Sequence, residues 1–465
     1  MELRYWADRA LAEVQRLQES FGEFAEHPSL AIGEDAFGQA FAELVDRLGG
    51  NPPFHHPRYL AQMMKPPHPA AIVGHLAAMR VNPNNHSLDG GPATSEMERE
   101  VVEQVAGVFG MTGTLGHLTS SGTVANLEAL YVARESAPGR AVAVSAQAHY
   151  THERMCRLLG VPVVRVPVDA AGRMDVAALD SLLRREDIGT VVVTAGTTGL
   201  GALDPVPEVL ALRAEHGFRV HVDAAYGGFF ALIADDSADG VAAAPFRAIR
   251  ECDSVVVDPH KHGLQPYGCG AVLFADPEVA RFYRHDSPYT YFTSDEPHLG
   301  EISLECSRSG AAAAALWLTF RVLPPTPDGL GEVLRPGRRA ALEWTRLLGE
   351  SPLLAPYQPP ELDILTAVPR APDMSTVDRI AAEVMIAGMR AEPADQLHIA
   401  TLPVTAEELA ARGHRVRADA DSARLFRSVL MKPEHEDWIP RAHAQLERLV
   451  AQSSNSNRSP STHRS

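Results

Sequence analysis

The sequence is short of positive charge and of long apolar runs, and each shortage excludes a class of protein. Its 465 residues contain 42 lysines and arginines against 59 aspartates and glutamates, which gives a formal net charge of −17. Phosphate backbones are bound by basic surfaces, so this balance argues against a nucleic-acid partner. No apolar run reaches about 18 residues, so we expect no membrane-spanning helix and no membrane partner.

Cysteine is also scarce. The four cysteines make no CxxC pair, which is typical of reduced thiols in a cytoplasmic protein. Neither an HExxH motif nor paired Cys/His spacing occurs among the 20 histidines, so we expect no metal site. The N-terminal segment is charged and amphipathic, without the apolar region of a signal peptide.

Composition divides the chain into four parts. We expect a helical arm, a large domain, a small C-terminal α+β domain and a disordered tail at residues 1–70, 71–330, 331–451 and 452–465. The arm leaves through a proline- and histidine-rich loop, which suits either packing on a partner subunit or an ordinary connector. Prolines and glycines at residues 324–336 indicate a hinge between the two domains.

The middle of the large domain alternates between strand-like and helix-like segments. We expect strands at residues 141–145, 163–166, 190–194, 219–222, 254–257 and 271–274, with helices between them at 175–185 and 206–216. This alternation predicts an α/β fold with a mainly parallel sheet and helices on both faces. Ligands of such sheets bind at the carboxyl ends of the strands.

A polar loop at residues 80–98 precedes this region. Ser95 and Glu98 have the spacing of a capping box, so we expect a helix to begin there. Asn85 and His86 in the same loop fit a simple turn and a substrate entrance equally well.

Lys261 lies in a tight polar turn between two apolar runs, residues 254–257 and 271–274. A lysine held between buried strands is poorly solvated, which favours its neutral amine. Such an amine is a nucleophile that can form a Schiff base, whereas the alternative is a surface lysine in a hairpin.

Two further turns have sequences typical of ligand-binding loops. Residues 120–123 leave free N–H groups and hydroxyls at a helix N-terminus, which suits either an anion site or a plain cap. Residues 196–204 resemble a dinucleotide-binding loop, but Asp204 replaces the last glycine of that fingerprint, so we reject NAD.

Pyridoxal 5'-phosphate (PLP) needs a lysine for its aldehyde, donors for its phosphate, a carboxylate for its ring nitrogen and flat or small groups beside its ring. Lys261 meets the first demand and Asp223 the third. The phosphate would be bound by Ser121, Gly122 and Thr123, and the ring faces would be covered by His149 and Ala225. Singly, Asp223 could be a helix cap and His149 a satisfied loop histidine, but all these residues follow strands in one expected sheet.

At this point a family resemblance is evident. The matching segments are residues 119–127, 196–198, 221–225 and 258–261. They resemble the group II PLP-dependent amino-acid decarboxylases of fold type I. Residues 82–85, 92–96, 125–128 and 261–267 look most similar to the bacterial tyrosine decarboxylases.

This resemblance implies a large PLP-binding domain with a mainly parallel seven-stranded sheet, followed by a small α+β domain. It also implies a homodimer with shared active sites, in which the turn at residues 307–310 reaches the partner's phosphate. It adds Thr198, His260 and Ser307 to the cofactor site, and Asn85, His86, Tyr289 and Tyr291 to the substrate site. Tyr267, six residues after Lys261, is the expected proton donor, although hairpin packing would also explain it.

The implied activity is α-decarboxylation of an L-amino acid, which releases CO2 and an amine. A decarboxylation-dependent oxidative deaminase or a lyase on the same fold is the alternative. The substrate stays open between an aromatic, tyrosine-like amino acid and an acidic or other polar one. His86, His262 and Gln265 favour a polar side chain, and Arg308 is the nearest candidate for a carboxylate clamp.

Overall fold

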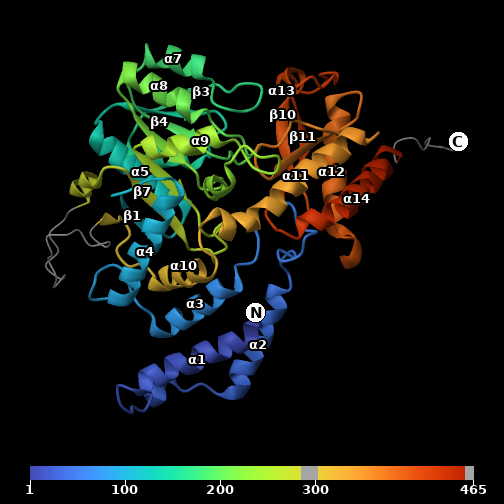
Figure 1. The fold of residues 1–465 in the computed structure, drawn as a ribbon. Coiled ribbons are helices and arrows are strands. Elements are labelled where there is room, and N and C mark those ends of the chain that lie inside the picture. Colours follow the sequence, from blue (N-terminus) through green and yellow to red (C-terminus); the bar gives the residue numbers. More distant parts are fainter. Residues whose placement is uncertain (284–301, 456–465) are drawn as a thin grey trace.

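Seven strands form the central sheet of the computed structural model, which describes residues 1–283 and 302–455. Their order is β1-β7-β6-β5-β4-β2-β3, and β7 alone runs antiparallel to its neighbours (Figure 1). The strands are β1 (Leu115–Thr119), β2 (Ala141–Ser145), β3 (Val163–Val166), β4 (Ile188–Thr194), β5 (Arg219–Asp223), β6 (Ser254–Val257) and β7 (Gly270–Phe274). The predicted α/β fold with a seven-stranded, mainly parallel sheet is confirmed.

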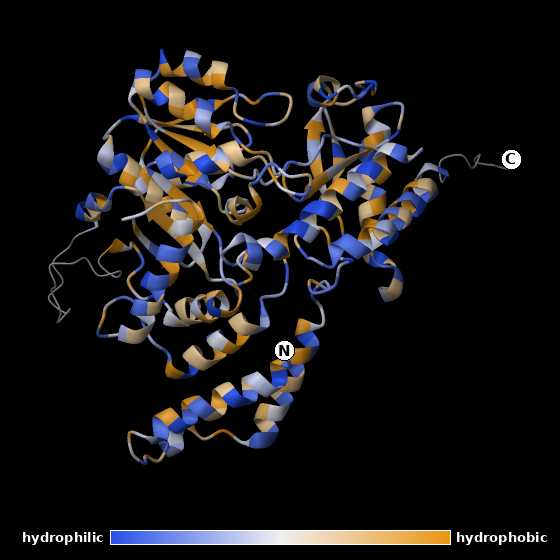
Figure 2. Ribbon diagram, viewed as in Figure 1, coloured by the Kyte–Doolittle hydropathy of each residue, from blue (hydrophilic) through white to orange (hydrophobic). Residues whose placement is uncertain are grey.

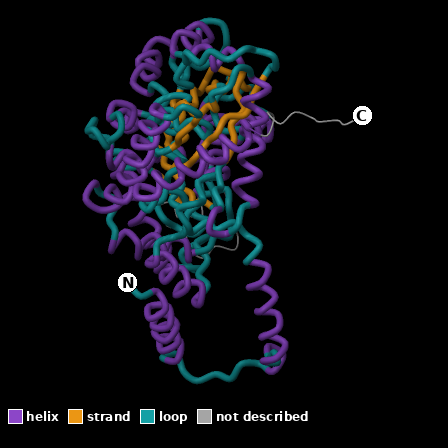
Figure 3. The backbone as a smooth tube through the Cα atoms, turned by 90° about the vertical axis from the view of Figure 1, so that its right-hand side faces the viewer, coloured by secondary structure: helices purple, strands orange, loops and turns teal. Residues whose placement is uncertain are grey.

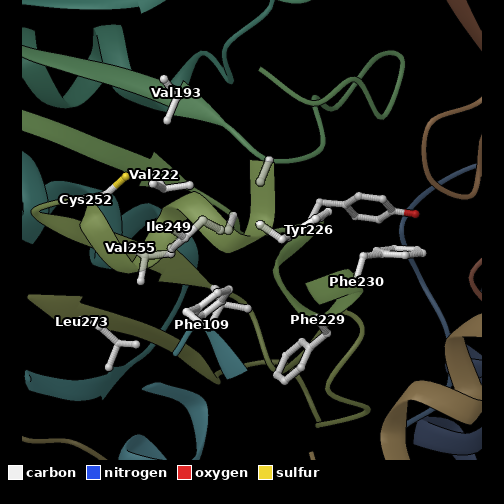
Figure 4. Close-up of a cluster of buried hydrophobic side chains, with 14 of the residues drawn as sticks. Phe109, Val193, Val222, Tyr226, Phe229, Phe230, Ile249, Cys252, Val255 and Leu273 are labelled. Carbon is white, nitrogen blue, oxygen red and sulfur yellow. The ribbon is translucent and has the colours of Figure 1, made fainter. Parts of the chain in front are cut away.

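Helices cover both faces of this sheet (Figure 1). They are α4 (Pro92–Val108), α5 (Gly122–Ser136), α6 (Thr151–Leu159), α7 (Val176–Leu183), α8 (Val206–His216), α9 (Ala243–Ala248) and α10 (Gly310–Val322), and α3 (Pro69–Val81) packs on the outside of α10. Neighbouring residues of one strand enter different apolar clusters. Val193 belongs to the large cluster that also contains Phe109 and Phe229 (Figure 4), whereas Val192 belongs to a smaller cluster with Leu130 of α5 and Cys156 of α6. Burial on both faces explains why these strands are continuous apolar runs.

Strand β1 was not among the strands that we expected from the sequence; it directly precedes the turn at residues 120–123. It pairs along its whole length with β7, from Leu115 opposite Phe274 to Thr119 opposite Gly270. Gly116 is required there, since a Cβ atom would lie 2.6 Å from the Leu273 side chain. The partner strand, rather than local propensity, therefore makes this segment extended.

Two helix boundaries differ from our expectations. Helix α4 begins at Pro92 with Gly91 as its N-cap, so the predicted capping box is wrong and Ser95 lies inside the helix. Proline at the first helical position needs no N–H partner, which favours this earlier start. At the expected hinge, residues 324–336, a π-helical turn (Pro327–Gly331) leads directly into α11 (Glu332–Glu350), so this helix begins inside the segment; the hinge itself stays a prediction.

A second sheet of four antiparallel strands lies in the C-terminal part, in the order β10-β11-β9-β8. Its elements are β8 (Leu354–Pro356), β9 (Ile364–Pro369), β10 (Ala400–Thr405) and β11 (Ser422–Val429), with α11, α12 (Met374–Arg390), α13 (Ala406–Ala411) and α14 (His435–Asn455). Strands β8 and β11 were not expected. Helix α14 extends into the predicted tail, whose remainder lies outside the described residues. The domain boundaries stay predictions.

The N-terminal arm consists of α1 (Leu3–Glu19) and α2 (Glu34–Leu48), and neither helix buries a residue. Helix α1 lies beside α3, whereas α2 stands apart from α1 across an extended loop (Figures 1 and 3). Apolar residues line both helices (Figure 2), and Phe37 and Phe41 are 58% and 55% exposed. No helix among the described residues is both long and apolar enough to cross a bilayer.

Candidate active site

A cavity of about 190 Å³ opens where the carboxyl ends of β4, β5 and β6 meet the N-terminus of α5. It lies at the edge of the sheet where parallel α/β folds bind their ligands. Its lining consists of Ser121, Gly122, Thr123, Asn126, His149, Thr151, Thr194, Gly196, Thr198, Asp223, Ala225, Tyr226, Asp258, His260 and Lys261.

Lys261 provides the cavity's only primary amine among the described residues. Its Nζ atom lies 3.0 Å from Oδ2 of Asp258, in the loop that connects β6 to β7. The chain has two other lysines, Lys65 and Lys432. Their Nζ atoms donate to the carbonyls of Met431 and Tyr59 instead, and neither lines the cavity.

Asp223 ends β5 with its carboxylate held from two sides. Oδ2 lies 2.8 Å from Nε2 of His152, and Oδ1 accepts the Ala225 N–H at 3.1 Å. Burial alone would raise the pKa of Asp223, but the His152 hydrogen bond and the positive charge of Lys261 outweigh it and hold the pKa below its usual value. An ionised carboxylate here can keep a ring nitrogen protonated. Sequence reasoning missed His152, which follows His149 by three residues.

His149 is fixed at the start of α6. Its Nδ1 lies 2.8 Å from Oγ1 of Thr151, and its ring packs on Tyr150 with centroids 4.2 Å apart. Burial is the main cause of a lowered pKa, although Asp223 acts in the opposite direction. A neutral imidazole held in one orientation is suited to cover the face of an aromatic ring.

The turn at residues 121–123 forms an anion cradle. Ser121 is the N-cap of α5, and its Oγ accepts the Val124 N–H at 3.3 Å. Only glycine fits at position 122, because a Cβ atom would lie 2.6 Å from Oδ2 of Asp258. The first N–H groups of the helix are therefore open to a phosphate.

These observations test whether the cavity suits PLP. It gathers an amine, an anion cradle, an ionised carboxylate and a fixed imidazole. Two buried oxygens, Thr194 Oγ1 and Asp258 Oδ1, have no hydrogen-bond partner and so leave polar capacity for a ligand. The residues fit the group.

Of the other cofactor residues expected from the sequence, Thr198, Ala225 and His260 also line the cavity. Ser307 does not: it is exposed and its Oγ accepts a hydrogen bond from Asn84 Nδ2 at 3.2 Å. Thr151, Asn126 and Tyr226 line the cavity but were not expected there.

The expected proton donor, Tyr267, and those expected substrate residues that the structure describes are not part of the cavity lining. The Tyr267 hydroxyl donates to the Met63 carbonyl at 3.3 Å, and its ring packs at a tilt against the His260 ring, with centroids 4.9 Å apart. Asn85 is buried and donates its amide N–H groups to Thr94 O and Glu98 Oε2. His86 does not line the cavity, and Tyr289 and Tyr291 fall outside the described residues.

Three residues suspected of binding a polar substrate side chain point away from the cavity. His262 is 2% exposed and packs against the rings of Tyr226 and Phe230, each 4.8 Å away. Gln265 is buried and donates to the Gly263 carbonyl. Arg308 donates to Glu98 Oε1 at 2.6 Å, so it is an internal tie rather than a free carboxylate clamp. Local sequence could not show these orientations.

The one cluster of possible metal ligands among residues 1–283 and 302–455 is Asp180, Glu215 and His216. Arg184 pairs with both carboxylates, at 3.0 and 2.8 Å. Their charge is thus balanced by an arginine on the same surface.

Comparison with known proteins identifies the class. A family model described as the pyridoxal-dependent decarboxylase conserved domain matches residues 52–326. The chain belongs to this family.

Individual relatives and solved structures agree with that assignment. The L-tyrosine decarboxylase of Enterococcus faecium is 27% identical over 76% of this chain and 75% of its own length. A probable L-aspartate decarboxylase of Halobacterium salinarum is 35% identical over 60% of this chain and 75% of its own length. The crystal structure of Oryza sativa TDC with PLP and tryptamine has a TM-score of 0.79 at 18% identity, covering 97% of this chain and 98% of that one. Mouse CSAD has a TM-score of 0.77 at 20% identity, with 94% and 91% covered. At such identities the two structures show the fold alone.

The protein is therefore a PLP-dependent amino-acid decarboxylase. The predicted family, fold type, cofactor and reaction class are confirmed by these comparisons together with the fold.

Proposed function

We propose that this decarboxylase converts L-tyrosine, or a closely related aromatic amino acid, to CO2 and the corresponding amine. The observation that carries this choice is the charge of the cavity. Among its described lining residues no arginine occurs and Lys261 is the one lysine, which the cofactor requires. An acidic side chain would have no bidentate partner there. The tyrosine decarboxylase relative supports the same choice.

Different cavity residues would bind different parts of the cofactor. Lys261 would hold the aldehyde covalently, and Ser121, Gly122 and Thr123 would bind the phosphate at the α5 N-terminus. Asp223 would hold the proton on the ring nitrogen. When bound, PLP supplies the electron sink that takes up the bonding pair as the substrate carboxylate leaves as CO2.

The remaining lining residues would set geometry around the ring. His149 and Ala225 would face its two sides, while Thr198 and His260 would contribute further polar and packing contacts. Ser307 would reach the phosphate site of a partner subunit from its exposed turn.

Tyr267 stays our candidate for the group that protonates Cα after CO2 leaves. Its hydroxyl now donates to Met63 O, so it must exchange that acceptor for the substrate carbon. Catalytic hydrogen bonds often form only in the substrate complex, which permits this change. Asn85, His86, Tyr289 and Tyr291 remain proposed substrate-side residues. For Asn85, the internal use of its amide restricts it to shaping the loop.

An acidic amino acid is the second candidate, favoured by the relative named as a probable L-aspartate decarboxylase. A panel of tyrosine, phenylalanine, aspartate and glutamate, scored by amine formed, separates the candidates. We expect the highest kcat/KM for tyrosine and a lower value for phenylalanine, which lacks the hydroxyl that polar groups at the cavity could bind. If only aspartate or glutamate is turned over, the substrate is an acidic amino acid and the aromatic proposal is wrong.

We propose further that the functional unit is a homodimer. Every residue of α2 is exposed and no residue of α1 is buried, and a second copy of the chain would bury their apolar side chains. Phe37→Glu with Phe41→Glu should shift the mass measured by light scattering to that of a monomer, whereas Gln39→Glu on the same helix should not. A monomeric, fully active wild type would contradict the shared-site proposal.

We propose a cytoplasmic location, supported by four cysteines that are all free thiols. Recovery of the enzyme with the cytoplasmic fraction of producing cells tests this.

A further inference from the structure

His152 contacts the Asp223 carboxylate, which lines the cavity, from outside the cavity. It lies in the first turn of α6 with 0% exposure, and its Nε2 is 2.8 Å from Oδ2 of Asp223. The other carboxylate oxygen accepts the Ala225 N–H. Asp223 is thus gripped by one side chain and one backbone group.

Within the part of the chain that the structure describes, the second nitrogen of this ring has no partner: Nδ1 of His152 is buried and makes no hydrogen bond there. A buried polar atom without a partner costs free energy, which an apolar residue at this position would avoid. The contact with Asp223 is therefore the one polar interaction through which this imidazole offsets that cost.

Nearby groups do not take over this role. His221 lies 6.3 Å from His152, centroid to centroid, and its ring nitrogens contact Ser254 Oγ and Asn126 Oδ1, each at 2.8 Å. Burial lowers the pKa of His221 to about 3, so this second ring is neutral. Among the described residues, His152 and Lys261 are then the basic side chains that lower the pKa of Asp223 most.

We propose that His152 is a positioning residue that orients the Asp223 carboxylate and sustains its negative charge, so that the cofactor's ring nitrogen keeps its proton. The proposal rests on the assignment of Asp223 to that nitrogen. His152 itself does not line the cavity, so it acts only through Asp223.

The test compares two cofactors in the same apo protein. One is PLP, and the other is its analogue in which carbon replaces the ring nitrogen. Binding is followed by the visible absorbance of the bound cofactor, without any amino-acid substrate. The variants are His152→Leu, which removes the donor, and His152→Gln, whose amide nitrogen can occupy the position of Nε2. His435→Leu is the control, because it removes an equally buried imidazole from α14 in the C-terminal part.

We expect His152→Leu to weaken PLP binding about tenfold, the range of one hydrogen bond to a charged group, and to change binding of the carbon analogue less than about twofold. His152→Gln should recover most of the PLP affinity, and His435→Leu should not distinguish the two cofactors. With substrate, kcat should fall for His152→Leu at nearly constant KM.

Equal losses for both cofactors would show that His152 only supports the fold, and would overturn the proposal. No loss with PLP would overturn it as well. If His152→Leu fails to fold, His152→Gln and His152→Asn carry the comparison, because the shorter asparagine amide cannot reach Asp223. Failure of every tested amino acid as a substrate would count against the proposed substrate and leave this binding test intact.

Discussion

The Nζ atom of Lys261 lies 3.0 Å from Oδ2 of Asp258, and the same carboxylate fills the space beside Gly122 where a side chain would begin. One carboxylate thus connects the lysine loop after β6 with the phosphate turn at the start of α5. The amine and the anion cradle are placed relative to each other by this contact, before any ligand binds.

We expect PLP to be attached to Lys261. Borohydride reduction and peptide mapping should place the pyridoxyl group on the peptide that contains it. The comparison is demanding, because burial lowers the pKa of Lys65 to about 7 and of Lys432 to about 8, so both are also reactive amines. A label on either of these would remove Lys261 from the mechanism.

Gly122→Ala should lower PLP affinity by about tenfold or more, since a new Cβ atom would push Asp258 out of place and narrow the cradle. Cofactor content after dialysis measures the effect. Gly107→Ala in α4 is the matched control, because no heavy atom lies within 4 Å of its added Cβ. Equal cofactor retention in the two variants would contradict the importance of this close approach.

Asp223→Asn should keep the fold and lower kcat by about a hundredfold or more, because an amide cannot stabilise a protonated ring nitrogen as a carboxylate does. Steady-state kinetics with unchanged thermal unfolding would establish this. Turnover close to that of the wild type would disprove the pairing.

The lowered pKa of Lys65 should make the stability of the folded protein depend on pH. The folded pKa of this lysine, about 7, is lowered mainly by burial and is below the value of about 10.4 expected in the unfolded chain. Between these values the folded protein binds fewer protons, so the wild type gains stability as the pH rises through this window. The free energy of unfolding of Lys65→Met should therefore rise relative to that of the wild type as the pH is lowered from about 9 to about 6. Urea midpoints at several pH values measure this, with exposed Arg80→Met as a control whose difference from the wild type stays constant. A pH-independent difference for Lys65→Met would refute the buried-amine account.

The parallel part of the sheet was predictable because its strands are continuous apolar runs, and the cavity residues follow those strands directly. Strand β1 was not predictable, since Gly116 and His117 weaken the local pattern and the segment becomes a strand by antiparallel pairing with β7. The start of α4 was predicted too late in the sequence. Ser95 and Glu98 have the spacing of a capping box, but Pro92 occupies the first helical position.

The directions in which side chains point could not be predicted from the sequence either. His262, next to Lys261, points away from the cavity into an aromatic pocket, and Arg308 is tied to Glu98. In contrast, His152 reaches Asp223 although nothing in its local pattern indicates a partner 71 residues away. These contacts depend on how distant segments pack, which periodicity and motif spacing do not contain.

Product analysis with tyrosine and PLP distinguishes decarboxylation from oxidative deamination. We expect one CO2 and one tyramine for each tyrosine consumed, with no oxygen uptake, and loss of both products in Lys261→Ala. An aldehyde with ammonia and peroxide would instead show oxidative deamination, and would contradict decarboxylation with simple proton return at this site.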